Sequence, residues 1–349
     1  IDLDLGVDMD ARVLSGSALY RLQWLDERAS ELVLDTRGID IRTVQGLDGK
    51  KWRDLTFKLD DEDAMYGSAL RITMKQQLSQ VRINYATRPE ASGLQWLTPE
   101  MTASGQPFMF SQSQAIHARS WVPLQDTPGV RFTYDARIRT DPSLMALMSA
   151  DNDPNAKRDG DYRFSMPQKI PSYLLAIAVG DLVFKPISSR SGVWAEPSVI
   201  DAAAGEFSDT EKMIQVAENL YGPYQWGRYD LLILPASFPF GGMENPRLSF
   251  ITPTVIVGDK SLTSLIAHEL AQQIHERLDL ARWTRPVLLA EGVERERREA
   301  EPTARPVAPR QPPPAGARGR TAPTTTPRAP VDPAVRPMAG AAVPSSAEA

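Results

Sequence analysis

The sequence predicts an α+β protein, in which a mostly antiparallel β region precedes a region that mixes helices with strands. Apolar–polar alternation and β-branched residues dominate up to about residue 182. Helical periodicity first appears after residue 183, and the sequence after residue 293 is rich in proline, alanine and arginine. The predicted organisation is therefore 1–182, a β domain, then 183–292, an α+β segment, then 293–349, a tail.

Turn-forming clusters divide the first region into alternating segments, as expected for a large antiparallel sheet of saddle or sandwich type. The predicted strands lie within 18–25, 31–45, 69–87 and 130–140. The apolar segment 173–184 is interrupted by Gly180 and Asp181, and a membrane span needs about 18 apolar residues. We therefore expect a buried strand there.

The second region contains two predicted helices. The first, 208–223, begins with a capping box of Ser208 and Glu211 and ends at Gly222. Its predicted apolar face consists of Met213, Ile214, Ala217, Leu220 and Tyr221. The second helix is predicted over 259–278, with an inner side formed by Leu262, Leu265, Ile266 and Leu270. Between the helices we expect a buried strand at 229–237 and an edge strand with a turn at 241–257.

Residues 301–349 contain 12 prolines and no leucine, isoleucine or aromatic residue. Such a segment cannot bury enough apolar area to offset its ordering entropy, so disorder is predicted over 293–349. The chain begins with Ile1 rather than methionine. We expect that its natural start is missing and that a shifted reading frame produced the end, from about residue 272.

Composition excludes several classes of function. The net charge of −5 argues against a nucleic-acid or anionic-membrane partner. Without cysteine, disulfides, thiol catalysis and zinc–thiolate sites are impossible. A transition metal would need carboxylates and the three histidines, which are His117, His268 and His275. A cytoplasmic location is expected, and the sequence leaves the oligomeric state open.

His268 and Glu269 begin the helical zinc motif H-E-x-x-H, but Gln272 stands at the fifth position. Histidines at i and i+4 lie on one helix face and can share an ion. His275 lies about 10.5 Å further along the axis than His268, too far for a shared ion. The motif alone leaves three interpretations: a zinc site, a damaged zinc site, or two ordinary histidines on a helix.

Three segments in fixed order, 110–128, 238–253 and 258–271, resemble the zinc aminopeptidase family that contains leukotriene A4 hydrolase and aminopeptidase B. The order G-G-M-E-N followed by H-E-x-x carries the resemblance, which covers about residues 1–271. It implies a β-saddle N-terminal domain, the first part of a thermolysin-like catalytic domain, and one zinc ion. The predicted function is hydrolysis of the N-terminal peptide bond by metal-activated water.

The resemblance also implies roles for individual residues. His268 would bind zinc and Glu269 would be the general base. Glu291, nineteen positions after Gln272, would be the third ligand. Gln272 occupies the position of the second histidine ligand, and a neutral amide is a far poorer zinc ligand, so zinc binding is expected to be weakened or lost. The family's catalytic tyrosine lies beyond the matched segment.

The resemblance implies a pocket for the free amino terminus of a peptide, in which Glu244 binds the α-amine. The predicted substrate-binding residues are Gln112, Gln114, Gly241, Gly242, Met243 and Glu244. Alternating positions on a strand would point both glutamines to one face. The alternatives are a Gly-Gly turn with a solvated glutamate and an ordinary polar strand face. His117, Tyr221, Trp226 and Tyr229 are predicted to be structural, and His275 and Glu276 to lie on the polar side of the helix.

Three functions remain open at this point. The first is an aminopeptidase that Gln272 and the missing tyrosine impair. The second is a non-catalytic peptide-binding protein that keeps the amine pocket. The third is an epoxide hydrolase, suggested by segments 94–100 and 222–246, which are more similar to leukotriene A4 hydrolase than to alanyl aminopeptidases. Peptides with a free amino terminus are the partner that the first two share.

Overall fold

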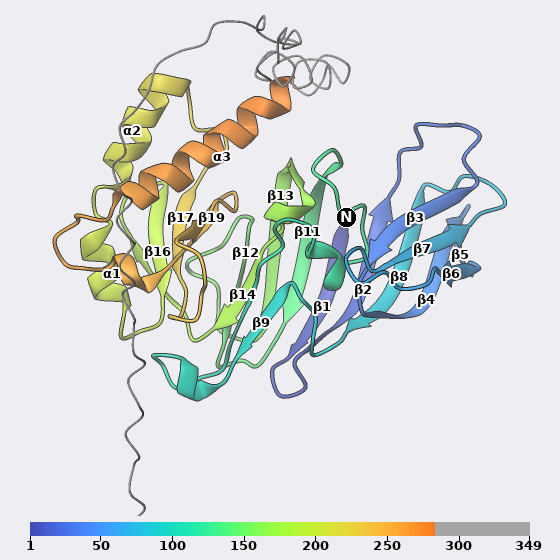
Figure 1. Cartoon of the computed structure of the whole chain (residues 1–349), viewed down its shortest axis with the longest axis horizontal. Helices are drawn as coiled ribbons and strands as arrows, with labels where there is room; N and C mark the ends of the chain where they lie inside the picture. Colours follow the sequence, from blue (N-terminus) through green and yellow to red (C-terminus); the bar gives the residue numbers. More distant parts are fainter. Residues whose placement is uncertain (283–349) are drawn as a thin grey trace, which may run out of the picture. The chain divides into compact units, whose positions relative to one another are not determined.

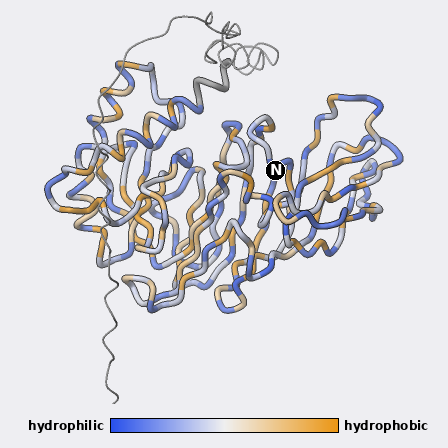
Figure 2. Tube along the Cα trace, in the orientation of Figure 1, coloured by the Kyte–Doolittle hydropathy of each residue, from blue (hydrophilic) through white to orange (hydrophobic). Residues whose placement is uncertain are grey.

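The computed structural model describes residues 1–282 of the chain, and side chains up to residue 276. The predicted α+β class is confirmed: strands dominate the first part, and α-helices appear only after residue 199 (Figure 1). Figure 2 shows hydrophobic and hydrophilic stretches alternating along the strands. The predicted disordered tail, 293–349, and Glu291 lie outside the described residues.

The first part is organised around a seven-stranded sheet, which is antiparallel except for one pair of neighbours, β1 and β11. In sheet order, its strands are β13 (Asp161–Pro171), β11 (Arg131–Arg139), β1 (Asp2–Asp8), β2 (Val13–Arg21), β8 (Gln80–Thr87), β4 (Ile39–Asp48) and β5 (Lys51–Asp54). Alternate residues of β1 and β2 are buried, as the apolar–polar pattern predicts.

Two smaller antiparallel sheets complete this part of the chain. The four-stranded sheet consists of β12 (Met145–Met148), β14 (Ile177–Gly180), β10 (Phe108–Ser111) and β9 (Leu94–Leu97). The three-stranded sheet consists of β3 (Glu31–Thr36), β7 (Ser68–Thr73) and β6 (Phe57–Leu59). Short 3-10 helices lie at η1 (Pro99–Met101), η2 (Ala118–Ser120) and η3 (Ser172–Leu174). The buried strand predicted within 173–184 is β14.

The second part is a five-stranded sheet with helices. Its strands, in sheet order, are β15 (Val183–Pro186), β16 (Ser191–Ala195), β17 (Tyr229–Ile233), β19 (Leu248–Ile251) and β18 (Gly242–Met243). The helices are α1 (Ile200–Glu206), α2 (Thr210–Tyr221), the 3-10 turn η4 (Pro253–Val255) and α3 (Ser264–Arg282). Helices α2 and α3 pack together, and α3 contacts β18 (Figure 1). The predicted edge position of the 241–257 segment is confirmed for β18.

The predicted extent of two strands was wrong. Each predicted segment contains two strands, which belong to different sheets. The segment 31–45 turns at Gly38, whose φ of 60° favours glycine, and so divides into β3 and β4. The segment 69–87 divides into β7 and β8 in the same way. In both segments the buried positions change from even to odd numbers at the turn, from Leu34 to Ile39 and from Leu78 to Val81. This change of phase is the signal in the sequence that marks the division.

The predicted start of α2 was also wrong. Asp209, not Ser208, is its N-cap residue, and the Ser208 hydroxyl bonds to the carbonyl of Gly205. Glu211 does not close a capping box, because its carboxylate pairs with Arg190 and accepts from the hydroxyl of Ser188. The end of the helix is as predicted, with Gly222 at φ 93° following Tyr221.

Several residues predicted to pack inside are exposed. Leu220 and Tyr221 are 69% and 54% exposed, and Leu262 is 43% exposed because α3 begins only at Ser264. Trp226 and Tyr229 are buried as predicted. None of the helices in residues 1–282 combines the length and apolarity that crossing a membrane requires. The predicted domain boundary at residue 182 stays a prediction.

A buried ion pair connects the loop after η2 to the rest of the first part. The Arg119 guanidinium lies 3.0 Å from the Asp126 carboxylate, and these side chains are 6% and 0% exposed. The same carboxylate accepts a hydrogen bond from the Ser172 hydroxyl at 2.6 Å. The 3-10 helices η2 and η3 and the loop after η2 are thus joined through the Asp126 carboxylate.

We predict that Asp126→Ala lowers the free energy of unfolding by about 3–5 kcal/mol, because it leaves the Arg119 charge buried without its closest partner. Urea denaturation of both chains measures the change. The control is Asp26→Ala, since Asp26 pairs with the highly exposed Arg28 and its loss should leave stability close to the wild-type value. Equal stability of both variants would contradict the prediction.

Candidate functional site

The G-G-M-E-N motif, which includes β18, and the H-E-x-x motif of α3 meet where α3 contacts β18. Helix α3 carries Glu269, which is 3% exposed, on the same face as the buried Ile266 and Leu270. A methyl group on Gly242 of β18 would lie 2.3 Å from Glu269 Oε1. Glycine is therefore required at 242 for the strand to approach the Glu269 carboxylate so closely. Gly241 differs, because a Cβ there would make only ordinary contact with Leu265 at 3.4 Å.

Glu244 and Glu269 form a pair of buried carboxylates. Glu244 follows β18 directly and is 8% exposed, so the alternative of a solvated glutamate is wrong. Burial, followed by the charge of Glu244, raises the pKa of Glu269 to about 8. Burial also raises the pKa of Glu244. Oε2 of Glu269 is buried without a hydrogen-bond partner, so the pair can accept a cationic hydrogen-bond donor.

Of the two predicted glutamines, the structure brings Gln112 to this site but leaves Gln114 exposed. Gln112 Nε2 lies 3.4 Å from the sulfur of Met243, in the motif that carries Glu244. The prediction that both glutamines lie on a strand was wrong, because β10 ends at Ser111. Ser113 is buried, with its hydroxyl donating to the carbonyl of Leu175 at 3.0 Å, so the two glutamines flank an inward-pointing residue.

The metal-ligand positions His268 and Gln272 both lie on α3, and their role in binding zinc stays a prediction. His268 is exposed on α3. Gln272 is half-buried on the same helix. In the part of the chain that the structure describes, no three histidine or carboxylate side chains gather as a metal would need. These residues therefore do not fit a zinc ion by themselves, and Glu291 lies outside the described part.

Sequence reasoning missed a polar cluster beside this pair. Glu276 was predicted to lie on the polar side of the helix, which is wrong. Its carboxylate accepts a hydrogen bond from the Tyr173 hydroxyl and lies 3.4 Å from Arg131. Its charge also raises the pKa of Glu244. Position 276 is seven residues after Glu269 and hence on the same face of the helix, which is the signal that could have indicated it.

His117 lies away from the Glu244–Glu269 pair. Its Nδ1 is 2.8 Å from the Ser92 hydroxyl and 3.3 Å from Arg37. Burial, followed by the charge of Arg37, lowers the pKa of His117. These contacts agree with the structural role predicted for it.

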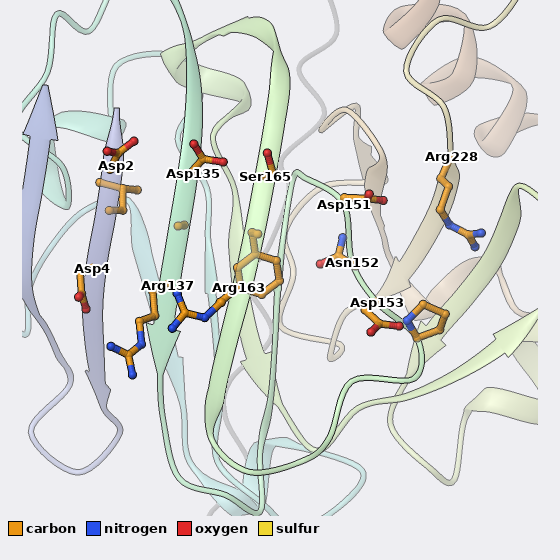
Figure 3. Close-up of a pocket in the computed structure, with 14 residues that line it drawn as sticks. Asp2, Asp4, Asp135, Arg137, Asp151, Asn152, Asp153, Arg163, Ser165 and Arg228 are labelled. Atoms are coloured by element: carbon orange, nitrogen blue, oxygen red, sulfur yellow. The ribbon is translucent and has the colours of Figure 1, made fainter. Parts of the chain in front are cut away.

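A wide groove of about 880 Å³ lies elsewhere, along β1, β11 and β13 (Figure 3). Five aspartates and three arginines line it: Asp2, Asp4, Asp135, Asp151, Asp153, Arg137, Arg163 and Arg228. Many of these charges are paired, for example Arg137 with Asp161 and Arg228 with Asp230. The groove contains none of the motif residues, so it is not the candidate site.

The fold and the two motifs define a chain of the metallopeptidase class. A model of the Peptidase M1 N-terminal domain matches residues 1–174, and a model of the Peptidase family M1 domain matches residues 206–293. The chain therefore belongs to the M1 family of zinc aminopeptidases. The first part is its N-terminal β domain, and the second is the beginning of its catalytic domain.

Two relatives are similar over about three quarters of the chain. Leukotriene A-4 hydrolase from Xenopus laevis is 44% identical over 280 residues, which are 77% of this chain and 45% of that protein. Leucine aminopeptidase 2 from Yarrowia lipolytica is 44% identical over 275 residues, which are 76% of this chain and 41% of that protein. The chain thus spans less than half the length of these relatives.

Solved structures agree. Native leukotriene A4 hydrolase from Saccharomyces cerevisiae matches with a TM-score of 0.71 and 37% identity, over 78% of this chain and 43% of that protein. The M1 zinc metallopeptidase from Deinococcus radiodurans matches with a TM-score of 0.59 and 21% identity, over 78% of this chain and 62% of that protein. The second similarity supports the fold alone.

We predict that the carboxylate pair makes the stability of the metal-free chain depend on pH. The pKa of Glu269 is about 8 when folded and about 4.3 when unfolded. The folded chain therefore binds more protons between these values, and the free energy of unfolding falls as pH rises from about 4.5 to 8. Glu269→Gln should remove this loss and be more stable than the wild type at pH 8 by about 2–4 kcal/mol.

Urea denaturation in EDTA at pH 5 and pH 8 measures this difference. The control is Glu62→Gln, which changes an exposed carboxylate and should follow the wild-type curve at both pH values. Parallel pH curves for the wild type and Glu269→Gln would show that the pair carries no such cost.

Proposed function

We propose that this chain binds peptides by their free amino terminus and is an aminopeptidase-type protein in which hydrolysis is impaired. The observation that supports this most is that Glu244, in the G-G-M-E-N motif, is buried beside Glu269 of α3. A protonated α-amine offers three N–H donors and one positive charge. Two buried carboxylates, one with an unpartnered oxygen, are complementary to that group.

In this proposal Glu244 binds the ammonium group, and Gln112 and Met243 border it from the side. Gly241 and Gly242 are proposed to let their own backbone approach the peptide closely, and Gln114 is proposed to lie at the outer rim. Glu269 is proposed as the general base beside the first peptide bond. The substrate class is therefore peptides, and a cytoplasmic location and the absence of nucleic-acid or membrane partners belong to the same proposal.

Hydrolysis is proposed to be impaired because the second ligand position holds Gln272. In the family, zinc activates the attacking water. Here His268 and Gln272 occupy the first and second ligand positions of the motif on α3, and the amide is a weak donor. Glu291 is proposed as the third ligand. A non-catalytic peptide-binding protein is the limiting case of this proposal, and no contact in the described residues favours epoxide hydrolysis.

We predict that leucyl-glycine binds at least tenfold more tightly than N-acetyl-leucyl-glycine, because acetylation removes the positive charge. Glu244→Gln should weaken leucyl-glycine binding about 10- to 100-fold, the effect of losing a charged hydrogen-bond partner, and should leave binding of the acetylated peptide unchanged. Calorimetric titration measures both. Glu62→Gln is the control, and equal affinity of the wild type for the two peptides would refute the proposed function.

We predict that the purified chain holds clearly less than one zinc ion per molecule after dialysis, and that Gln272→His raises the content toward one. Imidazole at i+4 supplies the donor that the amide lacks. Elemental analysis of both chains measures this. Adding Glu291→Ala to Gln272→His should abolish the gain if Glu291 is the third ligand. Stoichiometric zinc in the unchanged chain would contradict impaired metal binding.

A further inference from the structure

Gln273 is fully buried on α3, on the side of the helix that faces β18 and β19. Its side-chain nitrogen donates to the backbone carbonyl of Asn245 at 2.8 Å and to the Ser249 hydroxyl at 2.9 Å. Its side-chain oxygen accepts a hydrogen bond from the Tyr224 hydroxyl. Both ends of the amide are therefore used.

The backbone of Gln273 joins the same network. Its carbonyl accepts a hydrogen bond from the indole nitrogen of Trp226 at 2.8 Å. One residue of α3 thereby contacts the segment before β17, the strand β19 and the turn after β18. Buried polar groups without partners destabilise a protein, so this degree of pairing makes Gln273 a fixed point between these elements.

The contact with Asn245 concerns the site directly, because Asn245 follows Glu244 in the chain. The Asn245 carbonyl also accepts from the amide of Leu248 at 3.0 Å, which closes the turn between β18 and β19. The Gln273 amide takes the second lone pair of that carbonyl and so attaches the turn to α3. The side-chain nitrogen of Asn245 is buried without a partner, so this backbone contact is the one that anchors the residue to the helix.

Glu269 lies on the same helix, one turn before Gln273. The helix is rigid over this distance, so the Gln273–Asn245 bond sets how far the Glu244 carboxylate lies from the Glu269 carboxylate. Charged hydrogen bonds depend steeply on such geometry, and a small displacement in a binding site is costly. A side chain that only filled the same space would pack α3 but would not fix the turn.

We propose that Gln273 is a positioning residue, which holds the turn at Asn245 so that Glu244 is oriented to receive a primary ammonium group. The inference rests on the proposed function and adds to it the residue that makes the pocket selective for a free amine. Gln273 itself does not touch the peptide. Its effect is confined to ligands that carry the ammonium group, because these depend on where the Glu244 oxygens point.

The test compares the full chain with Gln273→Met and Gln273→Asn. Methionine fills a similar volume without hydrogen bonds, and asparagine keeps the amide but is one methylene too short to reach the Asn245 carbonyl. For either variant, the preference for leucyl-glycine over N-acetyl-leucyl-glycine should fall about tenfold, the value of one lost buried hydrogen bond. Affinities are measured below the melting temperature of each chain. If Gln273→Met does not fold, Gln273→Asn alone provides the test.

The matched control is Ser249→Ala, which removes the other acceptor of the same amide nitrogen and leaves the Asn245 contact in place. It should lower thermal stability but keep the preference for the free amine. If Ser249→Ala loses as much preference as Gln273→Met, or if the folded Gln273 variants keep the full preference, Gln273 is merely structural and the inference is wrong. A wild-type chain without any preference refutes the proposed function itself, and the inference with it.

Discussion

The packing of helix α3 against the β18–β19 pair is the constraint on which the site depends. Ile266, Glu269, Leu270 and Gln273 recur at helical spacing on one face, and all four are buried. The missing side chain of Gly242 lets the strand come close to this face. Two of the four residues are polar, and polar groups in a core require partners. Gln273 has them all, whereas one oxygen of Glu269 has none.

This difference in hydrogen bonding distinguishes Gln273, which supports the fold, from Glu269, whose unpaired oxygen is free to bind a ligand. A core built for stability alone would leave no carboxylate unpaired beside a second carboxylate. Here the free-energy cost of burying two carboxylates falls on Glu244 and Glu269, where a bound positively charged group would reduce it. With Gln272 at the position of the second histidine ligand, the proposed function assigns that relief to the ammonium group of a peptide rather than to a metal ion. Under the proposed function, the M1 fold would keep a charge-selective pocket at Glu244 and Glu269 although Gln272 stands at the second ligand position.

Much of this arrangement could be predicted from the sequence, although not all of it. Glu244 and Glu269 were expected together because their motifs are specific, and β11, β17 and the end of α2 were close to prediction because alternation and Gly222 are strong local signals. The division of 31–45 between two sheets was missed although a change of phase marks it, whereas the exposed Tyr221 and the N-cap Asp209 depend on tertiary packing, which overrides local pattern. Gln273 and Glu276 were missed since periodicity indicates the face of a helix but not the partners that it meets.

The pairing of β1 with β11 has a consequence for how the chain is made. Asp2 lies opposite Asp135 in a parallel register, a separation of 135 − 2 = 133 residues, and among the strands of residues 1–282 the other neighbour of β1 is β2. During translation at about 5–20 residues per second, one edge of β1 therefore waits about 7 to 27 seconds for its neighbour. An open strand edge invites association with other chains, and contacts so distant in sequence form slowly. Nascent copies of this protein are accordingly expected to need protection by chaperones until β11 has left the ribosome.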